Sequence, residues 1–477
     1  MNFKAKFGKV KIYKNRSFHH RSRAVVSGQA EKMTITHRRI LYIIFFIIFF
    51  IAAPITIMWA QGYKFDWRNK SWQKTGVLFL EVKPEKANIY LNDKFYDEKT
   101  SARIKNLLPK KYNIKIEKDG YITWEKDLEI YPSMTTFAQY VRLFKQDLPT
   151  INLLNNKIIL VSEQKNNSIA IITQENEIYG LYILNIEKQV LDKITEFNIQ
   201  PEKIFLSQQA EKILIQELNS WTIIDAATKK IIKLNDYLSL KELNISKPVF
   251  DSTDSNILYA ISPNGLEKIN LVVPETIIVI ADNIISFSIT NNNLYYLREK
   301  DKNFELISTN LNSLQPKEII SNLPISQNYD FYPAPDGLIN LIDSQNQILY
   351  IFDSRTKISP DKKTTIPGVK YINWHKNNSL LFINDYEIWT YQKHDDQYTK
   401  NLITRLSSKI NFALWFTYDT HLLYLTNNGL YITEVVTNNN EVIKYEKIKI
   451  GQKAYLTKKG EKLIWLTDNS IYESELQ

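Results

Sequence analysis

The chain has 477 residues, more than one ordinary hydrophobic core organises, so we expect two or more folded units. Aromatic residues make up 12% of the chain and glycines number only 12, which favours packed β structure over a flexible or low-complexity chain. The chain has no cysteine, which excludes disulfides, thiolate metal sites and cysteine nucleophiles.

The net charge of +10 is concentrated at the N-terminus. Residues 1–39 contain eleven Lys and Arg residues and one acid, Glu31, so residues 40–477 carry equal numbers of basic and acidic side chains. A basic excess spread over the whole chain would suggest a nucleic-acid partner. Its confinement to residues 1–39 instead predicts a disordered basic arm that contacts anionic lipid, with nucleic-acid binding as the less favoured alternative.

Residues 40–60 form one uncharged, strongly apolar stretch. At about 1.5 Å of rise per residue, a helix of this length crosses a hydrocarbon core of roughly 30 Å. Arg38 and Arg39 precede the stretch directly, and flanks rich in Lys and Arg stay on the cytoplasmic side. We therefore expect a single-pass plasma-membrane protein that contacts the lipid bilayer through this stretch. Its N-terminus would be cytoplasmic and residues 61–477 extracytoplasmic.

Two other interpretations fit this stretch less well. A cleaved signal peptide has a shorter apolar core and a small-residue cleavage site, whereas this stretch ends in Met58-Trp59-Ala60. A buried core helix normally has a polar face, and none is visible here. An uncleaved anchor is the expectation, and the N-terminal sequence of the mature protein would decide whether Ala60 is ever a cleavage point.

A small β module is expected after a juxtamembrane linker, residues 61–75, whose Trp67 and Trp72 would lie near the outer headgroups. From Gly76 the chain changes to short strands of alternating hydrophobic and polar residues, separated by turn pairs such as Asp119-Gly120. The predicted strands are residues 77–82, 88–91, 102–104, 112–117, 124–130 and 136–143. This pattern predicts a small antiparallel sandwich, which we place at residues 76–146.

Several motifs in this module resemble those of the PEGA domain, a small β domain of bacterial envelope proteins. The matching motifs are Gly76-Val77-Leu78, Pro84-Glu85-Lys86-Ala87 at the turn that names the family, residues 88–93, Leu107-Leu108-Pro109 and Lys118-Asp119-Gly120-Tyr121. The resemblance covers residues 76–144. It implies a β sandwich, a place in the bacterial cell envelope and no shared catalytic activity.

Two residues depart from the family pattern. Lys86 replaces the glycine of the name motif, and Lys110 stands where the family often has glycine after Leu-Pro. Glycine at such turns can supply a positive φ, so these departures concern turn geometry. The strand spacing and Asp119-Gly120-Tyr121 remain intact, and the expected fold is unchanged.

The chain after Pro149 repeats with a period of about 40–45 residues, and each unit contains four short strands separated by polar turns. The first strands of successive units align at Ile159, Ile204, Val249, Ile285, Asp330, Tyr371, Phe412 and Tyr455. Four strands per unit at this spacing predict a β-propeller over residues 149–477. The expected fold class is therefore mainly β, with a transmembrane helix, a small antiparallel sandwich and a propeller.

We expect eight blades, with seven as the alternative. The eighth unit lacks an outer strand, and residues 150–154 at the start of the array are candidates to supply it. Such pairing would join the two ends of the ring and remove an open sheet edge.

No catalytic motif stands out. The sequence has no G-x-S-x-G elbow, no G-x-x-x-x-G-K-[ST] loop and no H-E-x-x-H motif. His375, His394 and His421 are far apart in sequence, so we expect loop or strand-edge roles. Asp251-x-x-Asp254-x-Asn256 lacks the glycine and final glutamate of a calcium loop, and a turn is favoured there. We expect no catalytic residue, metal or cofactor.

Four tryptophans recur at strand positions of the repeats: Trp374, Trp389, Trp415 and Trp465. The favoured interpretation is packing between blades. The functional alternative is a sugar- or peptide-binding platform at the mouth of the ring, because aromatic-lined concavities are common ligand sites. These four are the candidate ligand-contacting residues.

The sequence as a whole favours a non-enzymatic, membrane-anchored envelope protein whose extracytoplasmic domains bind cell-wall polymer or another envelope protein. A propeller-type glycan hydrolase or lyase is the alternative. An enzyme would bring carboxylates with shifted pKa values together at the propeller mouth, whereas a binding protein would present aromatics or a polar rim. Sensing through the arm is a weaker third hypothesis, since residues 1–39 contain no domain.

Overall fold

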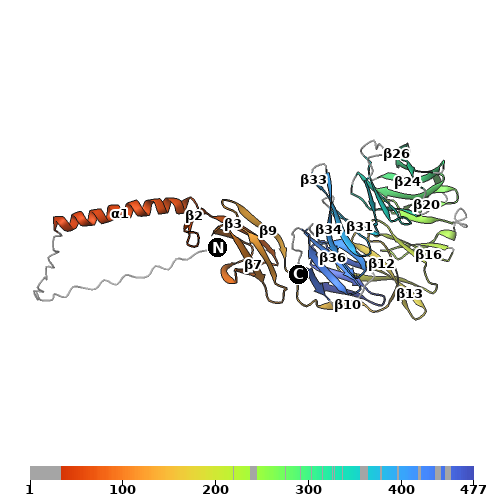
Figure 1. Cartoon of the computed structure of the whole chain (residues 1–477). Coiled ribbons are helices and arrows are strands. Elements are labelled where there is room, and N and C mark those ends of the chain that lie inside the picture. Colours follow the sequence, from red (N-terminus) through yellow and green to blue (C-terminus); the bar gives the residue numbers. More distant parts are fainter. Residues whose placement is uncertain are drawn as a thin grey trace, which may run out of the picture. The chain divides into compact units, whose positions relative to one another are not determined.

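The computed structural model describes residues 34–218, 220–236, 244–273, 276–290, 292–301, 303–313, 315–324, 326, 328–335, 337–354, 364–375, 379–394, 397–416, 420–435, 442–445 and 453–477. Residues 1–33, which contain most of the expected basic arm, lie outside these ranges. The described chain consists of one N-terminal helix followed almost entirely by β-strands (Figure 1). The expected mainly β fold class is confirmed.

Helix α1, Ile35–Ala60, begins before the expected apolar stretch and ends at the same residue. Thr34 caps its N-terminus, where the side-chain oxygen accepts a hydrogen bond from the His37 amide. None of its side chains is buried. It is the one helix among the described residues that is long and apolar enough to cross a membrane. A membrane anchor and a signal sequence both meet these two criteria.

The segment expected as a linker folds into a β-hairpin of strands β1, Tyr63–Asp66, and β2, Ser71–Lys74. Gly62, with a φ of +82°, follows the end of the helix. Its carbonyl oxygen accepts hydrogen bonds of 2.9 Å from both the amide and the hydroxyl of Thr75. The hairpin is a two-stranded sheet that pairs with no other described strand.

The module after the hairpin contains two antiparallel sheets, with strand orders β6-β3-β9 and β5-β4-β7-β8. Its strands are β3 Gly76–Lys83, β4 Asn88–Leu91, β5 Lys94–Lys99, β6 Ala102–Leu107, β7 Lys111–Glu117, β8 Trp124–Glu129 and β9 Thr135–Arg142. Alternate residues of β3, namely Leu78, Leu80 and Val82, are fully buried. This alternation is what a sandwich with a core between its sheets requires. Each of the six predicted strands overlaps a strand of the structure.

Strand β5 was not among the predicted strands. Asn92 and Asp93, which follow the predicted strand 88–91, both have positive φ (49° and 63°) and form a two-residue turn into β5. At the name motif, Lys86 has a φ of +65°. Lysine thus adopts there the left-handed conformation that a glycine would supply more easily.

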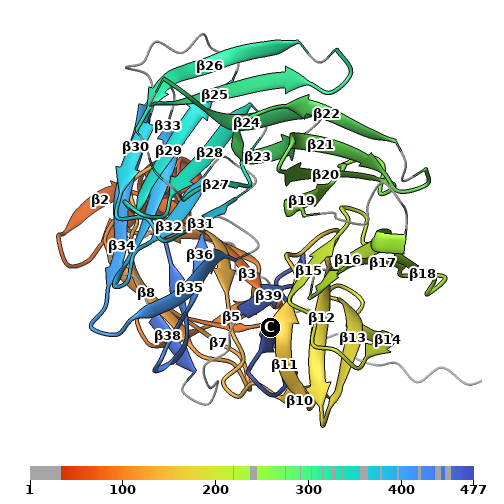
Figure 2. The same ribbon diagram turned by 90° about the vertical axis from the view of Figure 1, so that its right-hand side faces the viewer.

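From Thr150 onward the described residues form eight four-stranded antiparallel sheets, arranged around a common axis (Figure 2). We number them sheets 1 to 8, with the first strand of each innermost. Sheets 1 to 4 are β11 Lys157–Val161, β12 Ser168–Glu175, β13 Ile178–Asn185, β14 Val190–Phe197; β15 Lys203–Leu206, β16 Lys212–Glu217, β17 Ser220–Asp225, β18 Ile231–Lys233; β19 Ser246–Phe250, β20 Ile257–Ser262, β21 Gly265–Asn270, β22 Ile277–Ala281; and β23 Ile284–Thr290, β24 Asn293–Lys300, β25 Asn303–Asn310, β26 Pro316–Leu323.

Sheets 5 to 8 are β27 Tyr329–Tyr332, β28 Leu338–Asp343, β29 Ile348–Asp353, β30 Thr364–Pro367; β31 Tyr371–Trp374, β32 Leu380–Ile383, β33 Glu387–His394, β34 Gln397–Arg405; β35 Ile410–Trp415, β36 His421–Thr426, β37 Gly429–Glu434, β38 Val442–Tyr445; and β39 Lys453–Leu456, β40 Lys462–Leu466, β41 Ile471–Glu475, β10 Thr150–Leu154. A short 3₁₀ turn, Leu234–Asp236, follows β18. All eight first-strand residues aligned in the sequence fall in the innermost strands.

Sheet 8 takes its outer strand from the beginning of the array. Strand β10 pairs antiparallel with β41, and Thr150 lies opposite Ser474. The predicted closure by residues 150–154 is therefore confirmed. Because the two ends of the repeat share one sheet, the ring needs no separate cap at this edge.

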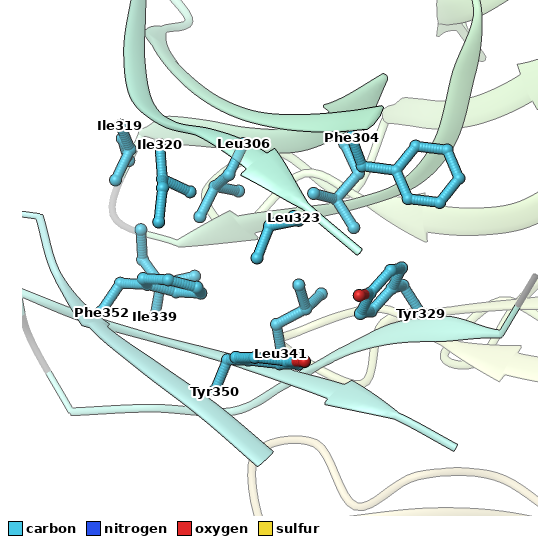
Figure 3. Packing of buried hydrophobic residues seen from close by; sticks show 11 residues of the cluster. Phe304, Leu306, Ile319, Ile320, Leu323, Tyr329, Ile339, Leu341, Tyr350 and Phe352 are labelled. Atoms are coloured by element: carbon cyan, nitrogen blue, oxygen red, sulfur yellow. The ribbon is translucent and has the colours of Figure 1, made fainter. Parts of the chain in front are cut away.

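Apolar side chains fill the space between neighbouring sheets. Figure 3 shows one such cluster, in which Phe304, Leu306 and Leu323 of sheet 4 face Tyr329 and Leu341 of sheet 5. The Tyr329 ring meets Phe304 edge-on, with ring centres 5.7 Å apart, and its hydroxyl donates a 2.9 Å hydrogen bond to the Pro324 carbonyl. Each cluster draws residues from two sheets, so one repeat cannot bury its apolar face alone.

The β3–β9 module contacts sheets 7 and 8 of the propeller. Phe144, just after β9, packs edge-on against Phe416, with ring centres 5.4 Å apart. The Lys145 amide donates to the Leu476 carbonyl at 2.9 Å, and the Tyr445 hydroxyl donates to the Lys145 carbonyl at 2.8 Å. Phe416 and Leu476 follow a first and a third strand. The turns from the first to the second strand and from the third to the fourth strand of each sheet lie on this side of the propeller, which we call the module face. We call the other side the opposite face.

Candidate binding sites on the propeller

The four candidate tryptophans do not meet in one platform. Trp374 and Trp389 lie half-buried in the cluster between sheets 5 and 6. Trp415 lies between sheets 6 and 7 and Trp465 between sheets 7 and 8, with exposed fractions of 6% and 5%. These positions are those of packing residues. A ligand-binding role for the four tryptophans stays a prediction.

A groove of about 550 Å³ lies on the opposite face, beside sheet 6. It is formed by the turn between β32 and β33 and by the links that join sheet 6 to its neighbours, and its lining includes Lys370, Asp385, Tyr386, Glu387 and Arg405. We call it the sheet-6 groove. It combines an aromatic ring with both signs of charge.

The turn that carries this groove is held by hydrogen bonds. The Asn384 side-chain oxygen accepts from the amides of Tyr386 at 2.9 Å and Glu387 at 2.7 Å. The Tyr386 carbonyl accepts a 2.8 Å hydrogen bond from the amide of Leu406, just after sheet 6, and the Asp385 carbonyl accepts one of 2.8 Å from the amide of Ile410, the first residue of β35. The Tyr386 side chain, 51% exposed, is therefore presented to solvent from a fixed backbone.

Glu387 is the centre of a hydrogen-bond network under the groove. One carboxylate oxygen accepts from Trp389 Nε1 and Asn384 Nδ2, both at 2.9 Å, and the other accepts from Arg405 Nε at 2.7 Å. These bonds, with that from Trp389 the largest cause, hold the pKa of Glu387 below its usual value. Trp389 is thus connected to the groove by its hydrogen bond to Glu387.

Asp385, the second acid of the groove, pairs with Lys370 Nζ at 2.5 Å. The hydrogen bond from Lys370 is the largest cause of the lowered pKa of Asp385. Both carboxylates are therefore ionised at neutral pH. Neither is suited to donate a proton as a general acid, which needs a raised pKa.

A larger groove, of about 860 Å³, lies on the module face across sheets 1 to 3. Its lining includes Lys193, Glu211, Asp225 and Lys229 and contains no aromatic residue. Asp225 accepts 2.8 Å hydrogen bonds from the amide and hydroxyl of Thr228, which lower its pKa. Glu211 accepts a 2.8 Å hydrogen bond from the Ser255 hydroxyl. Several of its polar groups are thus engaged with one another.

The innermost strands also bring tyrosines and charges close together. Burial raises the pKa of Tyr455, and nearby Tyr371 adds to this effect. Burial also raises the pKa of Tyr332, to which the charge of Glu163 contributes. These residues were not among the candidates predicted from the sequence. A signal existed, because Tyr371 and Tyr455 stand at aligned first-strand positions that hold isoleucine or valine in four other repeats.

The weak calcium candidate is a hydrogen-bonded turn. One Asp251 carboxylate oxygen accepts from the Thr253 amide and hydroxyl, both at 2.8 Å, and from the Asp254 amide at 3.1 Å. Asp254 in turn accepts from the Asn256 amide at 2.9 Å. Within the part of the chain that the structure describes, no three His, Asp or Glu side chains are grouped as a metal site would need. The His394 side chain lies outside that part.

A buried ionisable cluster joins the β3–β9 module to sheet 7. Glu434 accepts a 2.9 Å hydrogen bond from Trp124 Nε1 and forms an ion pair with Lys126. His421 Nε2 lies 3.7 Å from the Glu434 carboxylate. Burial, together with the charges of Arg142 and Lys126, nevertheless lowers the pKa of His421 to about 3. His421 is therefore neutral at physiological pH.

Residues 75–145 match the PEGA domain family. This range agrees closely with the resemblance noted at residues 76–144. The chain thus contains a PEGA domain followed by a β-propeller, after a helix that fits a membrane span. No curated protein matches the chain.

Solved structures similar to this chain are distant from it. The C-terminal WD40 domain of Sif2 is 10% identical with a TM-score of 0.47, and the match covers 69% of this chain and 98% of that one. Dipeptidyl peptidase 4 of Porphyromonas gingivalis is 10% identical with a TM-score of 0.44, covering 65% and 56%. A eukaryotic initiation factor is 9% identical with a TM-score of 0.48, covering 70% and 90%. These similarities carry no information about activity.

Proposed function

We propose that the protein is a non-enzymatic, membrane-anchored component of the bacterial cell envelope whose PEGA domain and propeller bind cell-wall polymer or another envelope protein. Helix α1 would cross the plasma membrane with the N-terminus in the cytoplasm. The helix, whose apolar side chains are not buried in the protein, and the basic excess of residues 1–39 support this topology. The PEGA match supports a place in the envelope.

The sheet-6 groove is the observation that carries the binding proposal. It exposes Tyr386 beside Lys370, Asp385 and Arg405. An aromatic face next to charged hydrogen-bonding groups suits the apolar face and hydroxyls of a sugar, or a peptide side chain with its amides. The groove lies on the face opposite the PEGA domain, so that domain does not cover it.

The same groove favours binding over hydrolysis. A glycosidase of the common type needs one protonated carboxyl group as acid and a second carboxylate as base or nucleophile. Asp385 and Glu387 both have lowered pKa values and are engaged with cations. The pair lacks the contrast between acid and base that such a reaction uses.

Co-sedimentation of the full-length protein, in detergent micelles, with purified peptidoglycan sacculi tests the proposal. We expect wild-type protein to sediment with the sacculi and Tyr386→Ala to bind about tenfold more weakly, the equivalent of about 1.4 kcal/mol for one aromatic contact. Leu218→Ala, which removes a 61% exposed apolar side chain at the turn after β16, outside the groove, is the matched control and should bind normally. Equal binding of the two variants would contradict the assignment of the groove.

Two further outcomes decide between the function classes. If the wild-type protein binds neither sacculi nor any protein of an envelope extract, the binding proposal is wrong. Release of soluble glycan fragments from the sacculi, dependent on the protein, would favour the hydrolase or lyase alternative.

A further inference from the structure

One face of hairpin β1–β2 is aromatic. In a strand pair, residues opposite each other share a face, so Tyr63 shares its face with Lys74, and Phe65 shares it with Trp72. The Phe65 and Trp72 rings meet edge-on at 5.4 Å, and Lys74 Nζ lies 5.6 Å from the centre of the Tyr63 ring. The other face carries Lys64, Asp66, Ser71 and Gln73. The hairpin is thus amphipathic.

The turn of the hairpin adds a second indole to this surface. Asp66 accepts hydrogen bonds from the amides of Arg68 at 2.9 Å and Asn69 at 3.4 Å, which fix the turn. Trp67 at its tip is 85% exposed, and its ring lies 5.0 Å from Phe65. Large aromatic side chains that are clustered and exposed mark a surface that contacts something else.

The hairpin is a sheet of only two strands. It pairs with no other described strand, and a lone two-stranded hairpin is marginally stable at best in water. A surface that binds the aromatic face of the hairpin would therefore also stabilise the fold of the hairpin.

The position of the hairpin identifies this surface. Only Gln61 and Gly62 separate it from helix α1, and their amides still bond to the last turn of the helix at 3.0 Å. Tryptophan and tyrosine side chains prefer the boundary between lipid and water. The turn and strands carry four basic residues, Lys64, Arg68, Lys70 and Lys74, against one acid, Asp66. Each basic residue near anionic headgroups contributes about 1 kcal/mol.

We propose that hairpin β1–β2 is a second membrane-binding element, which lies in the headgroup layer and inserts Trp67, Phe65 and Trp72 at the boundary of the acyl chains. Its ligand is an anionic lipid surface. This inference rests on the proposed insertion of α1, since that helix brings the hairpin to the bilayer.

A neighbouring loop extends the apolar surface at the base of the hairpin. The Ser133 amide donates to the Thr75 carbonyl at 3.0 Å, and Gly76 approaches the Tyr131 carbonyl so closely that a Cβ there would lie 2.4 Å from it. Tyr131 and Met134 of this loop are 49% and 62% exposed. The loop places two further apolar side chains beside the same bilayer surface.

The absence of native cysteines makes a site-specific test possible. Arg68→Cys places a single environment-sensitive fluorophore at the tip of the hairpin and leaves every aromatic ring intact. Glu177→Cys, in the exposed turn between β12 and β13, is the matched control. The full-length protein is reconstituted in vesicles that contain phosphatidylglycerol and a lipid with a nitroxide quencher at shallow acyl depth.

We expect both labelled proteins to float with the vesicles. The label at residue 68 should show blue-shifted emission and quenching of about twofold or more, and the label at residue 177 should show neither, because only the former reaches the interface. Adding Trp67→Ser and Trp72→Ser should return the label at residue 68 to water-like emission while flotation persists. Replacing phosphatidylglycerol by phosphatidylcholine should weaken the quenching, because the basic residues lose their anionic partners.

The outcomes separate the two membrane proposals. Flotation without quenching at residue 68 would overturn the hairpin assignment and leave α1 as the anchor. A blue shift without quenching would mean that the aromatic face binds protein, from this chain or a second copy, and would equally overturn it. Failure to float would contradict the membrane anchoring on which the inference rests.

Discussion

At the residue scale, Glu434 shows how one carboxylate joins two domains. Its oxygens accept hydrogen bonds from Trp124 Nε1 and from the Lys126 ammonium of the PEGA domain. Both donors lie about three hundred residues earlier in the chain. The side chains of Lys126 and Glu434 are only 8% and 13% exposed. A buried ion pair of this kind contributes to the choice of one docked arrangement, since each charge needs the other once both leave water.

Replacing Glu434 by glutamine keeps its shape and removes the charge that Lys126 faces. We expect Glu434→Gln to destabilise the docked domains by about 3 kcal/mol, the order found when one partner of a buried pair is removed. Glu163→Gln makes the same change in a side chain that is 78% exposed and pairs with Lys165. Glu163→Gln should lower the free energy of unfolding by less than about 1 kcal/mol, because exposed ion pairs contribute little to stability. Denaturant unfolding of the full-length protein measures both, and equal midpoints would contradict a structural role for Glu434.

His421 predicts how stability depends on pH. Its pKa is about 3 in the folded protein because of burial, against about 6.5 in an unfolded chain. Between these values the unfolded chain binds a proton that the folded protein does not, so the contribution is fully present above about pH 6.5 and is lost as the pH falls. The loss reaches up to about 1.4 kcal/mol per pH unit.

His421→Gln removes the titrating group and should flatten the decline in stability between about pH 6.5 and pH 4. Unfolding midpoints of wild type and variant, measured across this range, give the comparison. Parallel curves would show that His421 does not titrate on unfolding.

Single residues also show the limits of prediction from sequence. Turn residues can be recognised from the local sequence. The partners of Glu434 cannot, because burial and pairing arise only when distant segments of the chain meet. Tyr386 has the same difficulty. An exposed tyrosine and a buried one look alike in sequence until the turn held by Asn384 is known.

At the scale of elements, periodicity predicted most of the fold. The repeat placed all eight innermost strands and the closing strand β10, because alternating and continuous apolar runs follow directly from burial. Hairpin β1–β2 and strand β5 were missed. All three strands are short and rich in charged or polar residues, so the apolar pattern was weak. Their turns carried a signal, since Asn92-Asp93 is a good two-residue hairpin turn.

The closing strand can be tested by proline. The double change Ile151→Pro and Asn152→Pro removes two neighbouring amides of β10, and one of the two faces β41 because amide directions alternate along a strand. We expect hydrogen exchange in β41 to accelerate by about tenfold or more, since its outer edge opens. The same double change in β14, Leu191→Pro and Asp192→Pro, should leave β41 protected. Unchanged exchange in β41 after the β10 change would argue against closure of the ring.

At the scale of the whole molecule, the concentration of positive charge before residue 40 and the order of the domains could be predicted from sequence, whereas the grooves could not. The basic excess before residue 40 and the apolar stretch that follows are linear features. The sheet-6 groove combines residues of sheets 5 and 6 and of the links on either side of sheet 6, and only the folded ring brings them together. The proposed function therefore depends on both, since the helix would set the location and the groove would set the contact.

Cysteine accessibility in intact cells tests whether the propeller is displayed outside a membrane which the N-terminal arm does not cross. The chain has no native cysteine, so each introduced residue reports alone. With a membrane-impermeant maleimide, we expect Glu177→Cys to be labelled in intact cells and Ser27→Cys to be labelled only after lysis. Labelling of Ser27→Cys in intact cells, or protection of Glu177→Cys until lysis, would contradict this membrane topology.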